Sequence, residues 1–431
     1  MKKKILFCIH NPFQLDNLFV DIKFLSKSFS ITILTTNYAV NENIREKYKN
    51  FQKDTEIEKI FFVPFYKKDK ISRDIRSMIL THIFIRDLKK KIDFNNFDIC
   101  ISDTKFYIWQ RIIFEEYINK NTIQIGLTLD SILIPLNKFK ELLEGEDVDH
   151  ITKNIHKLRE KKKSKKKYSI LKKFHNVYVR QRDIFFDRIF LSKIFQKKEF
   201  IYKEKDFKLM ETDKFDFKLC FFYSSYFFWK KIYRNKCFLI KLKNECNCDK
   251  QLVQKKSKAL FLSTLWNNYK GNDNLLEEKI DKIISFFNFL REKNNYLNQL
   301  DFRFHPMESK ETITLIKNIF FKRNLTFVKF EDQNTPLSNL VCNYSHVIGA
   351  LSSSLSYVKN FCNNIDVYCL RSLSENYAGE YFYLKLLNEN VKHYDDVYNK
   401  FIEEKNFLSQ EDLNVKVTNF NQFLSSISQK K

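Results

Sequence analysis

Short apolar runs alternate with longer amphipathic segments along most of the chain, as is typical of buried parallel strands joined by helices. Near the start, the apolar run Lys4–His10 is followed by a helical pattern over Gln14–Ser28 and a second apolar run at Ile31–Thr35. This order predicts the first βαβ unit of a doubly wound sheet. Further strands are predicted at Ile60–Val63, Ile99–Ser102 and Ile123–Leu129, with a helix through Trp109 to Tyr117.

The same alternation returns beyond residue 258 and continues for more than a hundred residues. It predicts a second α/β domain of the Rossmann type, because each apolar run is followed by a helical pattern. Neither G-x-G-x-x-G nor a P-loop occurs, which argues against a dinucleotide or triphosphate held by a glycine loop. The predicted strands are Ala259–Thr264, Asp301–Phe304, Phe327–Phe330, His346–Ala350 and Ile365–Leu370, and the helices between them are Asn274–Lys293, Lys310–Lys322, Pro336–Asn343 and Ser354–Cys362.

Two segments interrupt the alternation. Residues 150–175 carry many Lys and few acids, which predicts a solvated, flexible insert. Residues 174–242 are aromatic and basic, so they form either core strands of the first domain or a surface for an anionic membrane. We expect an acceptor-side domain over 1–245, a nucleotide-sugar-binding domain over 258–400 and a helical tail over 401–431.

The chain has 431 residues, a length that suits two domains. Its net charge of +24 would suit nucleic acid, anionic lipid or an anionic substrate. Part of that charge accompanies 45 Phe, 21 Tyr and only five Gly and five Pro, a bias typical of AT-rich genomes. No apolar run has the length of a spanning helix, and the basic start is followed by no signal-peptide cleavage site, so we expect a cytoplasmic protein. The basic insert and the aromatic segment would hold it on the inner face of the membrane. The nine cysteines lack the spacing of a metal site.

The first candidate site is Arg303-Phe304-His305-Pro306, at the end of a predicted strand. Ligands bind at the carboxyl ends of strands in open α/β sheets. Arg303 and His305 are two residues apart, so on a strand both would point to one side. The imidazole could hydrogen-bond a leaving phosphate. Pro306 is expected to stiffen the entry to the next helix.

The second candidate site is Gly349-Ala350-Leu351-Ser352-Ser353-Ser354, where another predicted strand gives way to a helix. A helix N-terminus presents unpaired amides and partial positive charge, and it therefore binds phosphate. One serine would suffice as an N-cap. Three consecutive hydroxyls, Ser352, Ser353 and Ser354, favour an anion site.

A group that activates an attacking hydroxyl would have to come from the first domain. Asp103 and Asp130 each follow a predicted strand there, and each could act as a base or simply cap a helix.

These residues resemble motifs of a known group of enzymes. The run His10-Asn11-Pro12-Phe13-Gln14-Leu15 resembles the N-terminal motif of bacterial lipooligosaccharide sialyltransferases of glycosyltransferase family 52. His305-Pro306 and Ser352-Ser353 resemble the HP and serine motifs that those enzymes share with bacterial polysialyltransferases. The family's acidic motif has its nearest counterpart in Leu129-Asp130-Ser131, which keeps one acid and lacks the glycine.

The resemblance implies an α/β GT-B fold, in which two Rossmann-like domains face a central cleft. It implies an inverting, metal-independent transferase with no cofactor, which moves sialic acid or a related nonulosonate from a CMP-sugar donor to a lipid-linked oligosaccharide or other glycan. Asp130 would be the base and His305 would act on the donor phosphate. The expected substrate-binding residues are Asn11, Pro12, Gln14, Asp103, Arg303, Pro306, Gly349, Ser352, Ser353 and Ser354.

Two other functions remain open from the sequence. One is a CDP-polyol phosphotransferase or Kdo transferase of capsule or teichoic-type polymer assembly, which also binds a CMP-linked donor. The other is a basic, aromatic nucleic-acid binder, against which stands the lack of any RRM, KH or helix-turn-helix signature.

Overall fold

The computed structural model describes most of two α/β units. The described residues are 2–36, 42–64, 75–103, 108–129, 215–241, 257–266, 273–306, 308–331, 335, 337–350, 352–362, 364–370, 373, 391–395, 400–402 and 417–429. The basic insert expected at about 150–175 lies outside them.

The first unit contains a parallel sheet with strand order β15-β7-β6-β5-β4-β1-β2-β3, in which β15 is Val417–Asn419. Strands β1 to β3 extend the sheet in one direction, and β4 to β7 extend it in the other, as in a doubly wound fold. Its elements are β1 (Lys3–Ile9), α1 (Pro12–Asp16), α2 (Phe19–Ser26), β2 (Phe29–Thr36), α3 (Glu42–Lys53), β3 (Ile57–Val63), α4 (Ile75–Lys89), β4 (Ile99–Ser102), α5 (Ile108–Ile112), β5 (Ile123–Thr128), β6 (Phe217–Cys220), α11 (Tyr223–Tyr233) and β7 (Cys237–Lys241).

The second unit repeats this plan with strand order β10-β9-β8-β11-β12-β13-β14. All of its strand pairs are parallel except β13 with β14. Its elements are β8 (Lys258–Leu262), α12 (Asp273–Lys293), β9 (Gln299–Arg303), α13 (Lys310–Lys322), β10 (Val328–Phe330), α14 (Leu337–Leu340), β11 (His346–Gly349), α15 (Ser353–Phe361), β12 (Asp366–Leu370), β13 (Lys392–Asp395) and β14 (Lys400–Ile402).

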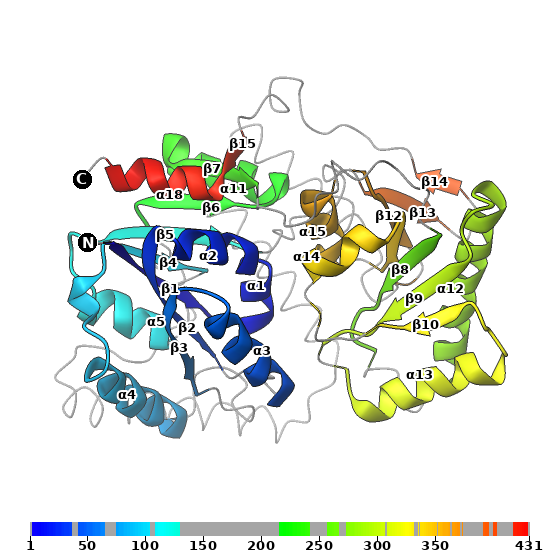
Figure 1. Ribbon diagram of the computed structural model, residues 1–431, viewed down its shortest axis with the longest axis horizontal. Helices are drawn as coiled ribbons and strands as arrows, with labels where there is room; N and C mark the ends of the chain where they lie inside the picture. The colour runs from blue at the N-terminus through cyan, green and yellow to red at the C-terminus, as the bar shows by residue number, and fades with distance from the viewer. Residues whose placement is uncertain are drawn as a thin grey trace, which may run out of the picture.

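The end of the chain returns to the first unit, as Figure 1 shows. Strand β15 (Val417–Asn419) pairs in parallel with β7, and helix α18 (Phe420–Gln429) packs against α2. Phe420 contacts Phe221 with ring centroids 6.2 Å apart, and Phe423 contacts Phe238 at 4.9 Å. The predicted GT-B architecture of two Rossmann-like domains is therefore confirmed.

Three expectations from the sequence need correction. The single helix expected over Gln14–Ser28 is divided, because Asn17 and Leu18 bond to the carbonyls three residues earlier instead of continuing the helix. The aromatic segment 174–242 contains a helix, α11, between two strands, where only core strands or a surface were considered. The tail expected to be helical also contains strand β15.

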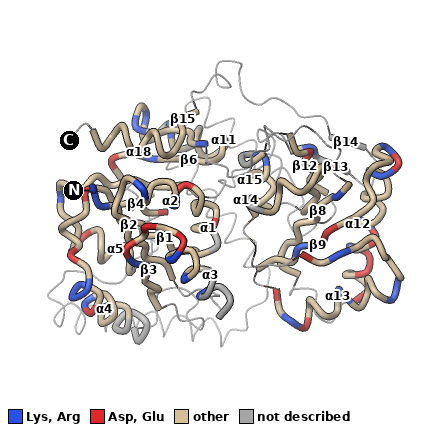
Figure 2. Tube along the Cα trace, viewed as in Figure 1, with Lys and Arg blue, Asp and Glu red and all other residues tan. Residues whose placement is uncertain are grey.

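One buried hydrophobic cluster extends through both units. It includes Phe7 and Ile33 of the first sheet and Leu260 and Val347 of the second, all fully buried. Two smaller buried clusters each belong to one unit, one to the second and one to the first. Basic and acidic residues occur on both units, and α12 carries both signs along its length (Figure 2). No helix in the described part of the chain is long and apolar enough to span a bilayer.

Candidate functional site at the strand ends

Three strands of the second sheet end together at one edge. Leu262 of β8 pairs with Arg303 of β9 on one side and with Gly349 of β11 on the other. Neighbouring strands are about 4.8 Å apart, so the ends of β9 and β11 are separated by roughly 10 Å. The two candidate turns, at His305 and at Ser352–Ser354, therefore leave the same edge on either side of β8.

This edge contains the topological switch point of the second sheet. The chain winds from β8 through β9 to β10 in one direction, and from β11 through β12 to β13 in the other. Loops diverge between β8 and β11, which is where open α/β sheets bind ligands. Gly349 lies at this point, and a Cβ there would approach the Leu262 carbonyl oxygen and the Leu355 side chain to 3.1 Å. Glycine thus allows β11 to lie close to β8 and the Leu355 side chain of α15 to pack against β11.

The His305 turn is tied to the loop after β8 at two places. The His305 amide donates to Ser263 Oγ at 2.8 Å, and the Ser263 amide donates to the Arg303 carbonyl at 3.0 Å. Beyond the turn, the Glu308 carboxylate accepts the amide of the buried Trp266 at 2.7 Å. These bonds fix the backbone on both sides of His305.

The His305 imidazole is partly buried, and burial lowers its pKa below the usual 6.5. The ring is therefore mainly neutral near pH 7, because desolvation disfavours the charged form. A neutral imidazole can donate one N–H to an anion while its other nitrogen accepts.

Of the other residues of the His305 motif, Arg303 bonds to a residue distant in the sequence, and Pro306 lies in the turn before α13. Arg303 is only 9% exposed, and its Nη2 donates to the Thr335 carbonyl at 2.6 Å. Pro306 does not start the next helix, because α13 begins at Lys310 with Ser309 as its N-cap. The effect expected for Pro306 therefore reaches only the turn, and the helix is capped separately.

The serine turn forms the N-terminus of α15. Ser352 is the N-cap, and its Oγ accepts the Ser354 amide at 3.2 Å. Ser353 and Ser354 occupy the first turn of this nine-residue helix. Capping by Ser352 accounts for one of the three hydroxyls, and the helix end provides the partial positive charge that favours an anion.

The first sheet has its own switch point, between β1 and β4. Asn11 follows β1 and precedes α1, and Pro12 and Gln14 lie in the first turn of that helix, where the Gln14 amide donates to the Asn11 carbonyl at 3.0 Å. The Tyr48 hydroxyl donates to the Pro12 carbonyl at 2.6 Å and holds this turn against α3. The three residues thus lie at the carboxyl edge of the first sheet.

Asp103 also lies at this edge, and its two carboxylate oxygens accept hydrogen bonds. Oδ2 accepts the His10 amide at 3.1 Å, and Oδ1 accepts Gln110 Nε2 at 2.6 Å. Gln110 is fully buried and also donates to Ser102 Oγ at 3.0 Å. Asp103 therefore joins the ends of β1 and β4.

His10 lies at this edge, and the pKa of its imidazole is strongly shifted. Burial lowers the pKa of His10 from 6.5 to about 3, so the ring is neutral at physiological pH. Trp109 Nε1 donates to His10 Nδ1 at 3.2 Å, and the two rings are stacked. Because Nδ1 accepts this bond, the ring proton of the neutral form is on Nε2.

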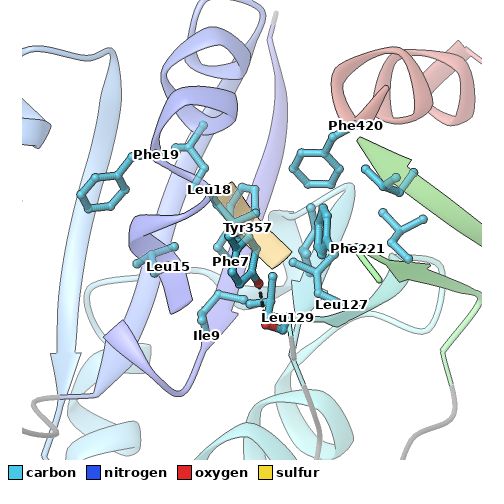
Figure 3. Packing of buried hydrophobic residues seen from close by; sticks show 14 of the residues in the cluster. Phe7, Ile9, Leu15, Leu18, Phe19, Leu127, Leu129, Phe221, Tyr357 and Phe420 are labelled. Carbon is cyan, nitrogen blue, oxygen red and sulfur yellow. Dashed lines mark hydrogen bonds between the residues drawn. The ribbon is translucent and has the colours of Figure 1, made fainter. Parts of the chain in front are cut away.

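The two edges meet through α15. The hydroxyl of Tyr357 donates to the carbonyl of Leu129, the residue that follows β5 (Figure 3). Leu129 directly precedes Asp130 in the sequence, and Asp130 itself lies outside the described residues. The helix that starts at the serine turn therefore packs against a strand end of the first sheet.

The structure thus groups the predicted residues into two sets. The second sheet has the first set at its strand ends: Arg303 and Gly349 end β9 and β11, and His305, Pro306 and the three serines come after them. The first sheet has the second set, Asn11, Pro12, Gln14 and Asp103, just after its strands β1 and β4. Sequence reasoning missed Ser263, Glu308, Trp109 and Gln110. Ser263 was counted as part of a predicted strand, and nothing in its local sequence marks it as a partner of His305.

Among the described residues, no group of three or more His, Cys, Asp or Glu side chains is placed to hold a metal ion. A phosphate at the second edge would be held by hydrogen bonds and the α15 N-terminus.

No family model matches the chain, and no curated protein matches it in sequence. Solved structures with a similar arrangement include a glycosyltransferase from Rickettsia africae ESF-5 (TM-score 0.39, 11% identity, 86% of this chain and 79% of that chain). The calicheamicin glycosyltransferase CalG4 (0.40, 10%, 90% and 83%) and the UDP-N-acetylglucosamine 2-epimerase from Rickettsia bellii (0.40, 11%, 86% and 79%) are also similar. At these scores the similarity carries no argument about activity, and the fold assignment rests on the two sheets themselves.

Proposed function

We propose that the chain is an inverting glycosyltransferase that moves sialic acid, or a related nonulosonate, from a CMP-activated donor to a hydroxyl of a cell-surface glycan such as lipooligosaccharide or capsule. One observation carries the proposal: the His305 turn and the serine turn flank β8 at the carboxyl edge of the second sheet. Such a position suits the phosphate of a nucleotide sugar. The motif resemblance supports the choice of CMP.

In the proposed reaction, the donor phosphate lies between the His305 imidazole and the first turn of α15. As the glycosyl C–O bond breaks, its electron pair goes to the phosphate oxygen and CMP leaves. The negative charge that develops there is stabilised by an imidazole N–H and by the amides of the helix N-terminus. These groups are already oriented, because Ser263 and the Ser352 cap fix both turns.

On the acceptor side, a carboxylate takes the proton of the attacking sugar hydroxyl. The new C–O bond forms on the face of the anomeric carbon opposite to CMP, so the configuration inverts. We assign this role to Asp130. Asp103 is the alternative, but both of its oxygens already accept hydrogen bonds that join β1 to β4.

We further propose that transfer needs no divalent ion. A nucleoside monophosphate leaving group carries less charge than a diphosphate, so a helix N-terminus and hydrogen-bond donors can stabilise it. Initial rates in EDTA should match those with added Mg²⁺. A rate that requires Mg²⁺ would contradict this part of the proposal.

We also propose that the enzyme acts in the cytoplasm, at the inner face of the membrane, where a lipid-linked acceptor would lie. The net charge of +24 supports contact with anionic lipid. Co-sedimentation with phosphatidylglycerol vesicles should exceed that with phosphatidylcholine vesicles and should fall as salt increases. Equal binding to both would contradict the proposal, and tighter binding to RNA than to either would favour the nucleic-acid alternative.

The central experiment compares four donors with the full-length protein. CMP-sialic acid, CMP-Kdo, CDP-glycerol and UDP-glucose are each incubated with truncated lipooligosaccharide, and the released nucleotide and the acceptor mass are measured. We expect CMP release and a mass increase of one sialic acid only with the first donor. Turnover of CDP-glycerol or CMP-Kdo would replace the proposed donor by the polymer-assembly alternative, and no turnover of any donor would contradict the transferase proposal.

A further inference from the structure

Tyr357 connects the proposed phosphate-binding helix to the other unit. It lies on α15, three residues beyond Ser354, which is about 4.5 Å along a helix axis. Its side chain is only 3% exposed, and its hydroxyl donates to the Leu129 carbonyl. In Figure 3 the Tyr357 ring lies among side chains of the first unit, including Phe7, Leu127 and Phe221.

The contact reaches the ends of two neighbouring strands of the first sheet. Leu129 follows the last residue of β5, and Phe222 follows β6 by two residues. The rings of Tyr357 and Phe222 meet edge to face, with centroids 5.0 Å apart and an interplanar angle of 77°. Both contacts lie at the carboxyl edge, where acceptor-side groups are proposed.

The surroundings of this contact are apolar and closed to solvent. Leu355 and Val358 of α15 belong to the same buried cluster as Leu129. The Leu129 carbonyl would lose its Tyr357 partner if the hydroxyl were removed, and a buried polar group without a partner is costly. The hydroxyl therefore contributes a directional constraint that the surrounding hydrocarbon cannot replace.

We propose that Tyr357 is a positioning residue that fixes the first turn of α15 against the carboxyl edge of the first sheet, so that a phosphate bound there faces the acceptor side. This inference rests on the proposed function. Transfer requires the anomeric carbon and the acceptor hydroxyl to approach within about 3 to 3.5 Å, and a misplacement of about 1 Å lowers the rate strongly. A hydrogen bond between the two units limits such displacement.

The variant Tyr357→Phe tests this role, because it keeps the ring and removes only the hydroxyl. We expect kcat for transfer to fall about tenfold, while the Kd for CMP, measured by calorimetry, stays within about twofold. The split is expected because the proposed contacts to the CMP phosphate lie in the second unit. A purely structural role would lower the melting temperature and leave kcat of the folded protein unchanged, and that result would overturn the proposal.

Tyr344→Phe is the matched control. Its hydroxyl is also buried but bonds within the second unit, to Asp301 at 2.9 Å and to Glu331 at 2.7 Å. It should leave kcat within about twofold of wild type. An equal loss of kcat in both variants would show that any buried hydroxyl matters, which would also overturn the proposal.

Hydrogen–deuterium exchange provides a readout that does not depend on activity. In Tyr357→Phe, peptides covering 123–129 and 353–361 should both exchange faster, because the contact joins them. In Tyr344→Phe, faster exchange should be confined to the second unit. Faster exchange of 353–361 alone would contradict the connection even in an active enzyme, and faster exchange of both peptides would support it even if no donor is turned over.

Discussion

The two sheets have the same winding, but their switch points are built differently. At the first, the backbone bonds are joined by bonds between side chains: Trp109 donates to His10, and Gln110 donates to Asp103 and to Ser102. At the second, backbone amides bond to side chains: His305 donates to Ser263, and Ser354 donates to Ser352.

The difference shows which substitutions should harm folding and which should harm chemistry. At the first edge, Gln110 and Ser102 are fully buried, so loss of one partner leaves another polar group unsatisfied. At the second edge, the turns take their shape from backbone contacts, and a side chain can change without collapse of the turn. We therefore expect the first edge to govern stability and the second to govern turnover.

The strongest test of this contrast is His305→Ala. We expect kcat to fall about a hundredfold or more, because an N–H on the leaving phosphate acts mainly in the transition state. The free energy of unfolding should change by less than about 1 kcal/mol, since the bond to Ser263 uses the backbone amide. Initial rates and urea unfolding measure the two effects.

The control for His305 is His346→Gln, at the opposite end of β11, which is separated from β9 by β8. His346 is 3% exposed and stacks on Tyr368 at 5.9 Å, so its loss should lower the melting temperature. Its kcat should stay within about twofold of wild type. If both variants lose turnover equally, the loss in His305→Ala does not show a catalytic role for His305.

Asp103→Asn and Asp130→Asn compare the two candidate bases. Asp103→Asn should lower the free energy of unfolding by about 1 to 3 kcal/mol, because an amide cannot accept both hydrogen bonds. Asp130→Asn should lower kcat about a hundredfold or more, the usual effect of losing a general base. Loss of turnover at full stability in Asp103→Asn alone would transfer the role of base to Asp103.

The pH dependence of stability sharpens the contrast from the first edge. His10 has a folded-state pKa of about 3 against an ordinary 6.5, so only the unfolded chain binds a proton between these values. Stability is therefore fully present above pH 6.5 and is lost as pH falls towards 3. The loss at pH 5 relative to pH 7.5 should be about 2 kcal/mol.

The variant His10→Gln isolates this contribution. It should be less stable than wild type at pH 7.5, but its stability should fall less between pH 7.5 and pH 5. Urea unfolding at pH 7.5, 6 and 5 gives the slope of the unfolding free energy against pH for wild type and for the variant. Parallel slopes would show that His10 takes up its proton equally in both states and would contradict its burial.

The smallest effect is expected for Ser263→Ala at the second edge. Removing the acceptor of the His305 amide should weaken catalysis by about 1 kcal/mol, or about fivefold in kcat, with faster exchange of that amide. Ser309→Ala is the matched control, because Ser309 caps α13 in the same loop. It should cost about 1 kcal/mol of stability with kcat unchanged. A loss of kcat in Ser309→Ala equal to that in Ser263→Ala would remove the distinction.

The sequence by itself indicated strands β1 to β5 and the alternation of strands and helices from β8 to β12, but it did not indicate α11, β13, β14 or β15. Runs such as Ile99–Ser102 and His346–Gly349 are short and apolar because parallel strands are buried on both faces. It also indicated that His305 and the serine run follow strands, since a strand end is visible where an apolar run stops. These features depend on burial and on local hydrogen bonding, which residue pattern records directly.

Only the tertiary structure decided which distant segments meet. Strand β15 joins β7, Ser263 accepts the amide of His305, and Tyr357 bonds to Leu129 across the two units. A hydroxyl or a carbonyl has no local mark that names a partner 42 or 228 residues away. Such pairs depend on how the complete sheets place their edges, because a hydrogen bond forms only where packing of the whole chain brings its two atoms within reach.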